Sequence, residues 1–289
     1  MRAAEAICHG AISVMNAMAT GTGASLGVNL WTKARVTITD QGSFKGCNLT
    51  EPDEDVGLIE TTARRVFKRF NVPRRFGALI ETESIIPVAV GLKSSSASSN
   101  AVALATVNAL GKKASPLEVI NLAVDASLEA RVTLTGAFDD ACACYFGGLF
   151  LTDNTHRRVL RRFSLDTNLS VLIHVPEGKR YSRDVKAADL ALIKDFMPTV
   201  QRGIWNGNYW PALTLNGLLY SSALSCDTSP TRAALEAGAV AAGISGKGPA
   251  TAAVVPPKKL MNILDSWDAY AGRVIEASLN SITTTRLSG

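Results

Sequence analysis

Apolar and polar positions divide the first half of the chain into strands and helices. The apolar run Ala3 to Val14 predicts a buried strand, and near alternation within Val28 to Thr39 predicts a second strand. Between them, residues 19–25 are small and polar, which predicts a loop. Residues 55–70 have apolar positions at helical spacing, and residues 76–86 alternate like a half-buried strand.

Helices are predicted next, and strands return after Gly147. One helix is expected to begin in the serine run after Gly91, and another to span Pro116 to Arg131. The second half predicts strands at 149–151, 170–175, 240–244, 250–255 and 273–279, and helices near 183–199, 209–224, from 228 and at 257–270. Because strands and helices mix without a regular βαβ rhythm, we expect an α+β fold. A division into residues 1–150 and 151–289 is predicted.

Composition and charge narrow the functional classes. The 289 residues are 47% hydrophobic and 19% charged, an ordinary globular profile. The net charge of +5 is spread along the chain, so we expect a small anionic ligand and no nucleic acid as partner. No run is apolar enough to cross a membrane, and the odd set of five cysteines lacks zinc spacing, which fits reduced thiols in the cytoplasm. The oligomeric state is left open.

The segment from Pro87 to Ala97 has the pattern of a phosphate-binding loop. A proline ends a strand, Gly91 turns the chain, and small hydroxyl residues begin an alanine-rich helix. The first N–H groups of a helix have no internal partners and carry the positive end of the dipole, so they attract phosphate. The alternative is that the serines only cap a core helix. The predicted ATP-binding residues are Pro87, Val88, Ala89, Val90, Gly91, Leu92, Lys93, Ser94, Ser95, Ser96 and Ala97.

A second glycine-rich segment, Ser245 to Gly248, separates two predicted strands. Glycines allow positive φ and a close approach of the backbone to a ligand. Such a segment alone could equally be a hairpin turn. Its occurrence together with the first loop favours a ligand-binding role.

Three acidic residues between the two loops are candidates for phosphoryl-transfer chemistry. Transfer to an alcohol needs a metal ion to neutralise the phosphates and often a carboxylate near the acceptor. Glu129 is predicted late in a helix, and Asp139 and Asp140 in or after a turn. The alternative is that the aspartates cap the following helix or occupy a surface turn.

The two loops resemble the motifs of the GHMP kinases, the superfamily of galacto-, homoserine, mevalonate and phosphomevalonate kinases. Residues 87–97 are similar to the central motif, with Lys93 where the family commonly has glycine, and residues 242–252 resemble the C-terminal motif. The lysine of the usual N-terminal Pro-Gly-Lys is missing at Cys8 to Ala11. Met15 to Ala24 and Phe138 to Ala141 resemble the archaeal type of shikimate kinase.

The resemblance implies a two-domain α+β fold, with an N-terminal ATP-binding domain like a ribosomal-protein domain and a ferredoxin-like C-terminal domain. It implies ATP and Mg²⁺ as cofactors, with the metal held by Ser95 and Glu129. Asp140 becomes the carboxylate that faces the acceptor hydroxyl, and Asp139 is its rival. The implied reaction is phosphorylation of shikimate to shikimate 3-phosphate.

Shikimate is a carboxylated ring triol, so its site should supply a cation and hydroxyl partners. The candidate substrate residues are Thr20, Thr22, Arg180, Arg183, Ser245, Gly246, Lys247 and Gly248. For the basic segment 178–183, a solvated turn is an equally good interpretation. Other hypotheses are a different GHMP kinase, such as homoserine or mevalonate kinase, a non-catalytic ligand sensor with the same fold, and a nucleic-acid-binding protein.

Overall fold

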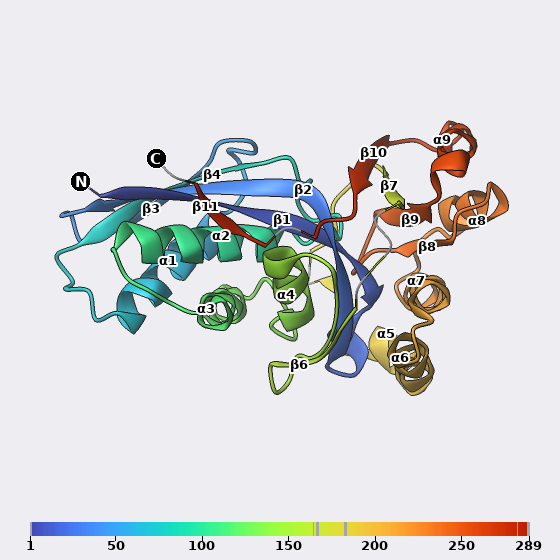
Figure 1. Cartoon of the computed structure of the whole chain (residues 1–289), viewed down its shortest axis with the longest axis horizontal. Helices are drawn as coiled ribbons and strands as arrows, with labels where there is room; N and C mark the ends of the chain where they lie inside the picture. The colour runs from blue at the N-terminus through green and yellow to red at the C-terminus, as the bar shows by residue number, and fades with distance from the viewer. Residues whose placement is uncertain (1, 164, 166–167, 182–183, 282, 288–289) are drawn as a thin grey trace.

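The computed structural model describes residues 2–163, 165, 168–181, 184–281 and 283–287. These residues form two sheets, one of seven strands and one of four, with helices packed against each (Figure 1). The α+β prediction is confirmed. Among the described residues, no helix combines the length and apolar character needed to cross a membrane.

Two long antiparallel strands form the centre of the seven-stranded sheet. They are β1 (Ala3–Met15) and β2 (Thr22–Thr39). The other strands are β3 (Phe44–Asn48), β4 (Gly77–Ser84), β5 (Leu149–Asp153), β6 (Arg158–Phe163) and β11 (Thr285–Leu287). β4 and β5 both pair with β2, β3 runs parallel to β4, and β11 pairs with β1. Strand β11 therefore brings the last described residues back to the first strand (Figure 1).

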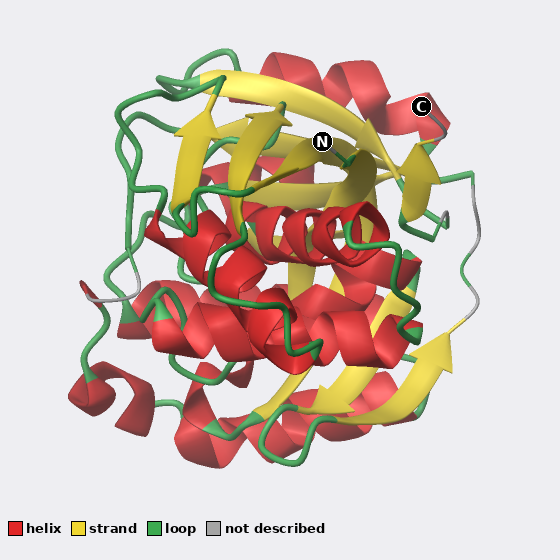
Figure 2. Cartoon of the chain, turned by 90° about the vertical axis from the view of Figure 1, so that its left-hand side faces the viewer, coloured by secondary structure: helices red, strands yellow, loops and turns green. Residues whose placement is uncertain are grey.

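Four helices cover one face of this sheet (Figures 1 and 2). They are α1 (Gly57–Arg69), α2 (Ser94–Ala109), α3 (Pro116–Glu129) and α4 (Phe138–Phe146). Helix α2 contacts β1 and β2 on one side and α1, α3 and α4 on the others, which explains why its residues are small and uncharged. A helix surrounded on all sides has no solvent face to carry charges.

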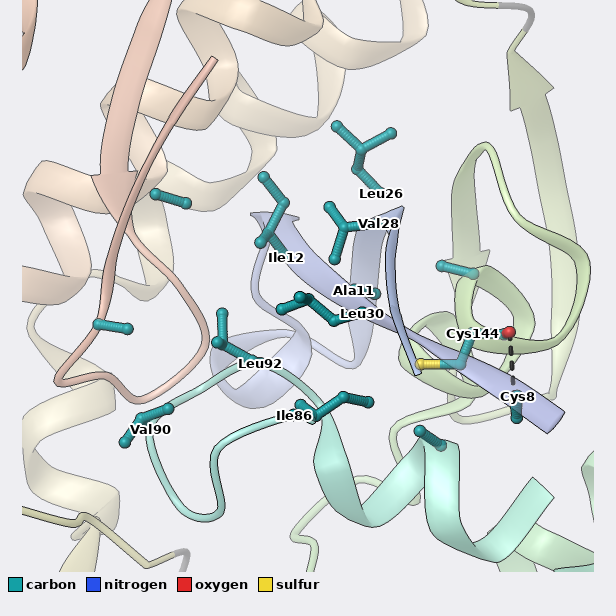
Figure 3. Packing of buried hydrophobic residues seen from close by; sticks show 14 of the residues in the cluster. Cys8, Ala11, Ile12, Leu26, Val28, Leu30, Ile86, Val90, Leu92 and Cys144 are labelled. Atoms are coloured by element: carbon teal, nitrogen blue, oxygen red, sulfur yellow. Dashed lines mark hydrogen bonds between the residues drawn. The ribbon is translucent and has the colours of Figure 1, made fainter. Parts of the chain in front are cut away.

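The core beneath the predicted phosphate loop comes from β1, β2 and the loop itself. Figure 3 shows Val90 and Leu92 of the loop in one cluster with Ile12 and Leu30 of the two strands. Leu92 is 1% exposed, and its carbonyl accepts a hydrogen bond from the Ala11 N–H at 3.4 Å. Apolar burial thus fixes the loop on the sheet, since each such side chain contributes about 1.5–3 kcal/mol.

The second sheet has the order β10-β7-β9-β8 and is antiparallel throughout. Its strands are β7 (Ser170–Val175), β8 (Ala241–Ile244), β9 (Thr251–Val255) and β10 (Arg273–Ser278). The accompanying helices are α5 (Ala187–Ala191), α6 (Met197–Trp205), α7 (Tyr209–Ala223), α8 (Ser229–Glu236) and α9 (Leu260–Trp267), with 3₁₀ turns η1 (Ala17–Ala19), η3 (Lys194–Phe196) and η4 (Pro257–Lys259). Gly217 of α7 packs on Gly243 of β8, where a Cβ would lie 2.5 Å from the Gly243 Cα.

The structure differs from the sequence-based expectation at several elements, among them the helix expected near 183–199, whose described residues form α5, η3 and α6. The predicted loop over residues 19–25 is wrong beyond Gly21, because β2 begins at Thr22 and its small residues are packed within the sheet. Asp139 and Asp140 lie in the first turn of α4, a helix that the sequence raised only as an alternative to a turn. Strands β3 and β11 were also not expected. The seven-stranded sheet includes β6 and β11, and the division at residue 150 stays a prediction.

Candidate active site

A cavity of about 440 Å³ is lined by residues from both parts of the chain. Its walls include the start of α2, the η1 turn, the segment after α3, and the glycine loop between β8 and β9. The structure therefore brings the two predicted motif loops to the same pocket, although residues 98–244 separate them in sequence.

The phosphate loop presents backbone and hydroxyl groups to this cavity. Gly91 has φ +96°, and Lys93 has φ +65° immediately before the first residue of α2. These left-handed conformations turn the chain sharply into the helix, so that its N-terminus faces the pocket. The predicted residues that line the cavity are Val88, Ala89, Gly91, Lys93, Ser94, Ser95 and Ser96. The remaining members, Pro87, Val90, Leu92 and Ala97, are buried and do not line it.

A buried hydrogen-bond network joins the phosphate loop to the second glycine loop. Ser245 Oγ donates to the Gly91 carbonyl at 2.7 Å and accepts from the Ser13 N–H at 3.1 Å. Ser13 Oγ in turn accepts from the Gly246 N–H at 3.1 Å. Ser245 is 1% exposed and does not line the cavity. Its hydrogen bonds instead hold the second glycine loop against the phosphate loop.

The two aspartates in the first turn of α4 line the cavity. Lys93 Nζ is 3.2 Å from Asp140 Oδ1 and donates to Ser13 Oγ at 2.7 Å. Ser25 Oγ lies 2.5 Å from Asp140 Oδ1 and 3.3 Å from Asp139 Oδ2. An ammonium group and a hydroxyl thus meet the same oxygen of Asp140. The structure places Asp140, the phosphate loop and a cation together, as the sequence predicted for the first two.

Asp139 is more deeply buried than Asp140. Asp139 is 3% exposed, and its pKa is raised from the ordinary value of 3.8 to about 7. Burial is the main cause of this rise and the negative charge of Asp140 the second, whereas Lys93 and a hydrogen bond from Asn154 oppose it. The two adjacent carboxyl groups therefore occupy different electrostatic environments.

Glu129, predicted as a magnesium ligand, does not line the cavity. It is the last residue of α3, its side chain is 53% exposed, and its Oε2 pairs with Arg65 Nε at 2.6 Å. The structure does not bring Glu129 together with Ser95. Ser127, two residues earlier, lines the cavity instead. The helical phase of α3 explains the difference, because two residues rotate a side chain by about 200°.

The candidate substrate residues divide into those that reach the cavity and those that do not. Gly246 and Lys247 line it, whereas Thr20, Thr22 and Gly248 do not. Burial and, to a lesser extent, the nearby charge of Lys93 together lower the pKa of Lys247 to about 8. Lys247 is therefore a cation of the second loop that faces the pocket.

Arg180 supports the second loop from outside the cavity. Its Nη1 donates to Cys226 Sγ at 2.7 Å and to the Lys247 carbonyl at 3.3 Å. The guanidinium is consequently engaged by the protein itself. The other predicted arginine, Arg183, lies outside the described residues.

Several residues at the site were not indicated by the sequence. Ser13 looks like an ordinary strand residue, Ser25 ends the segment predicted as a loop, and Asn154 follows a strand without any motif. Asn16 lies in the η1 turn, where its N–H donates to Asn216 Oδ1 of α7 at 2.9 Å. Their roles depend on partners in other elements of the fold, for which a single sequence carries no local signal.

Comparison with known proteins agrees with this geometry. The model of the GHMP kinases N terminal domain matches residues 57–148. A protein named shikimate kinase from Methanothrix thermoacetophila is 39% identical over 276 residues, covering 96% of this chain and 93% of the relative. The shikimate kinase of Pyrococcus furiosus is 41% identical over 274 residues, covering 93% and 96%. The chain belongs to the archaeal shikimate kinase family of the GHMP kinases.

Solved structures support the fold assigned to this shikimate kinase family member. The Methanococcus jannaschii mevalonate kinase superposes with a TM-score of 0.78 at 14% identity, covering 96% of this chain and 98% of that one. Homoserine kinase from Cytophaga hutchinsonii gives a TM-score of 0.76 at 17% identity, covering 99% and 98%. Membership of a kinase family implies the use of ATP as phosphoryl donor.

Proposed function

We propose that this protein transfers the γ-phosphoryl group of ATP to a hydroxyl of shikimate, giving shikimate 3-phosphate and ADP. The observation that carries the proposal is the convergence of Asp140, Lys93 and the N-terminus of α2 on one cavity. The choice of shikimate is supported by the relatives that bear this name and align over nearly their whole length.

The phosphates of ATP would bind at the start of α2. The N–H groups of its first turn lack partners within the helix, and the helix dipole favours negative charge there. Ser94, Ser95 and Ser96 add hydroxyl donors on the cavity side. The contacts between Gly91 and Ser245 hold this loop in place before the nucleotide arrives.

Asp140 would receive the proton of the acceptor hydroxyl as the oxygen attacks the γ-phosphorus. The bond from that phosphorus to the oxygen shared with ADP breaks, and ADP leaves with the electron pair. Lys93, 3.2 Å from Asp140, lies beside both the carboxylate and the phosphate loop. Its positive charge would stabilise the negative charge that develops between donor and acceptor.

Magnesium fits this site in part. Ser95 provides a hard oxygen on the cavity side, which suits Mg²⁺, whereas the Glu129 carboxylate is held by Arg65 away from the cavity. Ser95 is therefore the residue that we propose would hold the ion together with the phosphates. When bound, Mg²⁺ supplies neutralisation of the phosphate charge.

Lys247 is the residue that we propose binds the carboxylate of shikimate. It reaches the cavity from the second loop, whereas Arg180 is directed at Cys226. The pKa of the Lys247 ammonium is lowered to about 8. An anionic partner such as the shikimate carboxylate would stabilise the charged form and raise this pKa again.

A panel of alcohol acceptors tests the proposed reaction. ADP formation should require shikimate, and homoserine and mevalonate should give little product. Asp140→Asn should reduce kcat by at least about 100-fold while the protein stays folded. Turnover with another alcohol and none with shikimate would refute the substrate, and full activity of Asp140→Asn would refute its role.

A further inference from the structure

Asp139 contacts a set of buried polar groups that the proposed reaction does not use. Asn154 Nδ2 donates to Asp139 Oδ1 at 2.7 Å. The orientation of this amide is fixed, because Asn154 Oδ1 accepts from Thr152 Oγ1 at 2.7 Å and from the Asp139 N–H at 3.0 Å. Asp139 Oδ1 therefore accepts from an amide nitrogen, and a flip of the Asn154 amide that would put its oxygen there is excluded by the other two hydrogen bonds.

The space around the second oxygen of Asp139 is provided by a glycine in β2. A Cβ at Gly23 would lie 2.3 Å from Asp139 Oδ2 and 2.8 Å from the Ala17 Cβ. Any larger residue would therefore displace the carboxyl group. Asp139 is 3% exposed, and burial of an acidic side chain costs free energy unless the group is neutral or paired with a partner.

Ser25 connects the two carboxyl groups with a single proton. Its Oγ lies 2.5 Å from Asp140 Oδ1 and 3.3 Å from Asp139 Oδ2. The shorter contact takes the hydroxyl proton, since an ionised carboxylate is the stronger acceptor. The serine oxygen can then only accept a hydrogen bond from the other side. If Asp139 Oδ2 carries a proton, it can donate that hydrogen bond to Ser25 Oγ. If it is ionised, it repels the lone pairs of the serine oxygen.

The charged and titratable groups around Asp139 favour the neutral acid. Asp140 opposes a second negative charge, and Lys93 offsets this effect only in part because it already pairs with Asp140. The remaining titratable neighbours are uncharged at neutral pH, because burial raises their pKa values: Cys142, Cys144 and Tyr220.

We propose that Asp139 is a positioning residue held as a neutral acid, which orients Asp140 through a directed hydrogen-bond chain across Ser25. This inference rests on the proposed role of Asp140 in the reaction. Ser25 and Lys93 both meet Oδ1 of Asp140. The chain therefore points Oδ2 of Asp140 at the acceptor hydroxyl, and that oxygen receives the proton.

Asparagine is the natural test of a neutral acid at this position. In Asp139→Asn, the amide oxygen can accept from Asn154 and the amide nitrogen can donate to Ser25, as the protonated carboxyl does. Alanine can do neither. We therefore expect Asp139→Asn to keep kcat within about threefold of the parent at pH 6, and Asp139→Ala to lose about 30-fold.

The pH profile separates positioning from a purely structural role. Above pH 7 the parent should lose kcat as Asp139 ionises, and this decline should be absent in Asp139→Asn. Ser25→Ala should lower kcat about tenfold with little change in KM for ATP. A parent profile that Asp139→Asn reproduces, or an Asp139→Asn enzyme as inactive as Asp139→Ala, would overturn the proposal.

Infrared spectroscopy tests the protonation state without any substrate. At pH 6 the parent should show the C=O band of a protonated carboxyl group, which Asp139→Asn should lack. Absence of that band in the parent overturns the inference whatever the acceptor proves to be. Failure of the proposed reaction would instead appear as lack of turnover with shikimate while the band is present.

Discussion

Replacing Gly91 with alanine should separate the two loops that form the phosphate site. Gly91 has φ +96°, and a Cβ there would lie 2.0 Å from the carbonyl oxygen of Ser245. That oxygen belongs to backbone, so it cannot move aside as a flexible side chain would. Gly207, in the turn between α6 and α7, offers a matched control, with φ +88° and no atom within 4 Å of its Cβ position.

The expected cost follows from these contacts. A left-handed conformation costs an L-residue about 1–2 kcal/mol, and this applies to both variants. At Gly91 the loops must also separate by more than about 1 Å, which breaks the hydrogen bonds from Ser245 Oγ to Gly91 and from the Ser13 N–H to Ser245 Oγ. Each is worth about 1 kcal/mol. Gly91→Ala should therefore lose about 3–4 kcal/mol of unfolding free energy, against about 1–2 kcal/mol for Gly207→Ala.

Urea denaturation and equilibrium binding of a nucleotide analogue measure the two consequences. We expect Gly91→Ala to be less stable than Gly207→Ala and to bind nucleotide at least about tenfold more weakly, whereas Gly207→Ala should bind as the parent does. Equal stability of the two variants, together with undiminished nucleotide binding by Gly91→Ala, would show that the loop contact is not what forms the site.

Three further outcomes follow from the charged groups. The folded state favours protonated Asp139, so the free energy of unfolding should fall by up to roughly 4 kcal/mol as pH rises from about 4 through 7, and urea titrations of Asp139→Asn should lack this fall. Glu129→Gln should change KM for Mg·ATP by no more than about twofold in magnesium titrations, because its carboxylate pairs with Arg65; a tenfold increase would favour the metal role predicted from the sequence. Lys93→Met should lower kcat about 100-fold in the ADP assay, since Asp140 loses its cationic partner; a change below threefold would contradict that role.

Periodicity located most regular elements because the responsible residues are neighbours in sequence. The strand β7 and the start of α3 at Pro116 agree with the prediction residue for residue. Strand β3 is short, and its alternation of exposed and half-buried positions follows from pairing with β4. Helix α4 has only nine residues and two aspartates in its first turn, which resemble a surface turn in sequence.

The site was predictable as far as local motifs describe it. The phosphate loop and Asp140 were predicted because their residue types occur in a short, recognisable order, and both line the same cavity. The direction of a side chain at the end of a helix depends on its neighbours in space. The Glu129 side chain is directed at Arg65 of α1, with which it forms an ion pair. The proximity of Ser25 to both aspartates likewise depends on a pairing between β2 and α4 that no short segment encodes.

The pairing of β11 with β1 has a consequence for how the protein is made. The ribosome produces β1 before β11, so the edge of β1 from Glu5 to Ile7 lacks this partner strand while the intervening chain is synthesised. An open strand edge can pair with other chains. Nascent molecules, and molecules cleaved before residue 285, should therefore be more inclined to aggregate than those in which β11 has paired with β1.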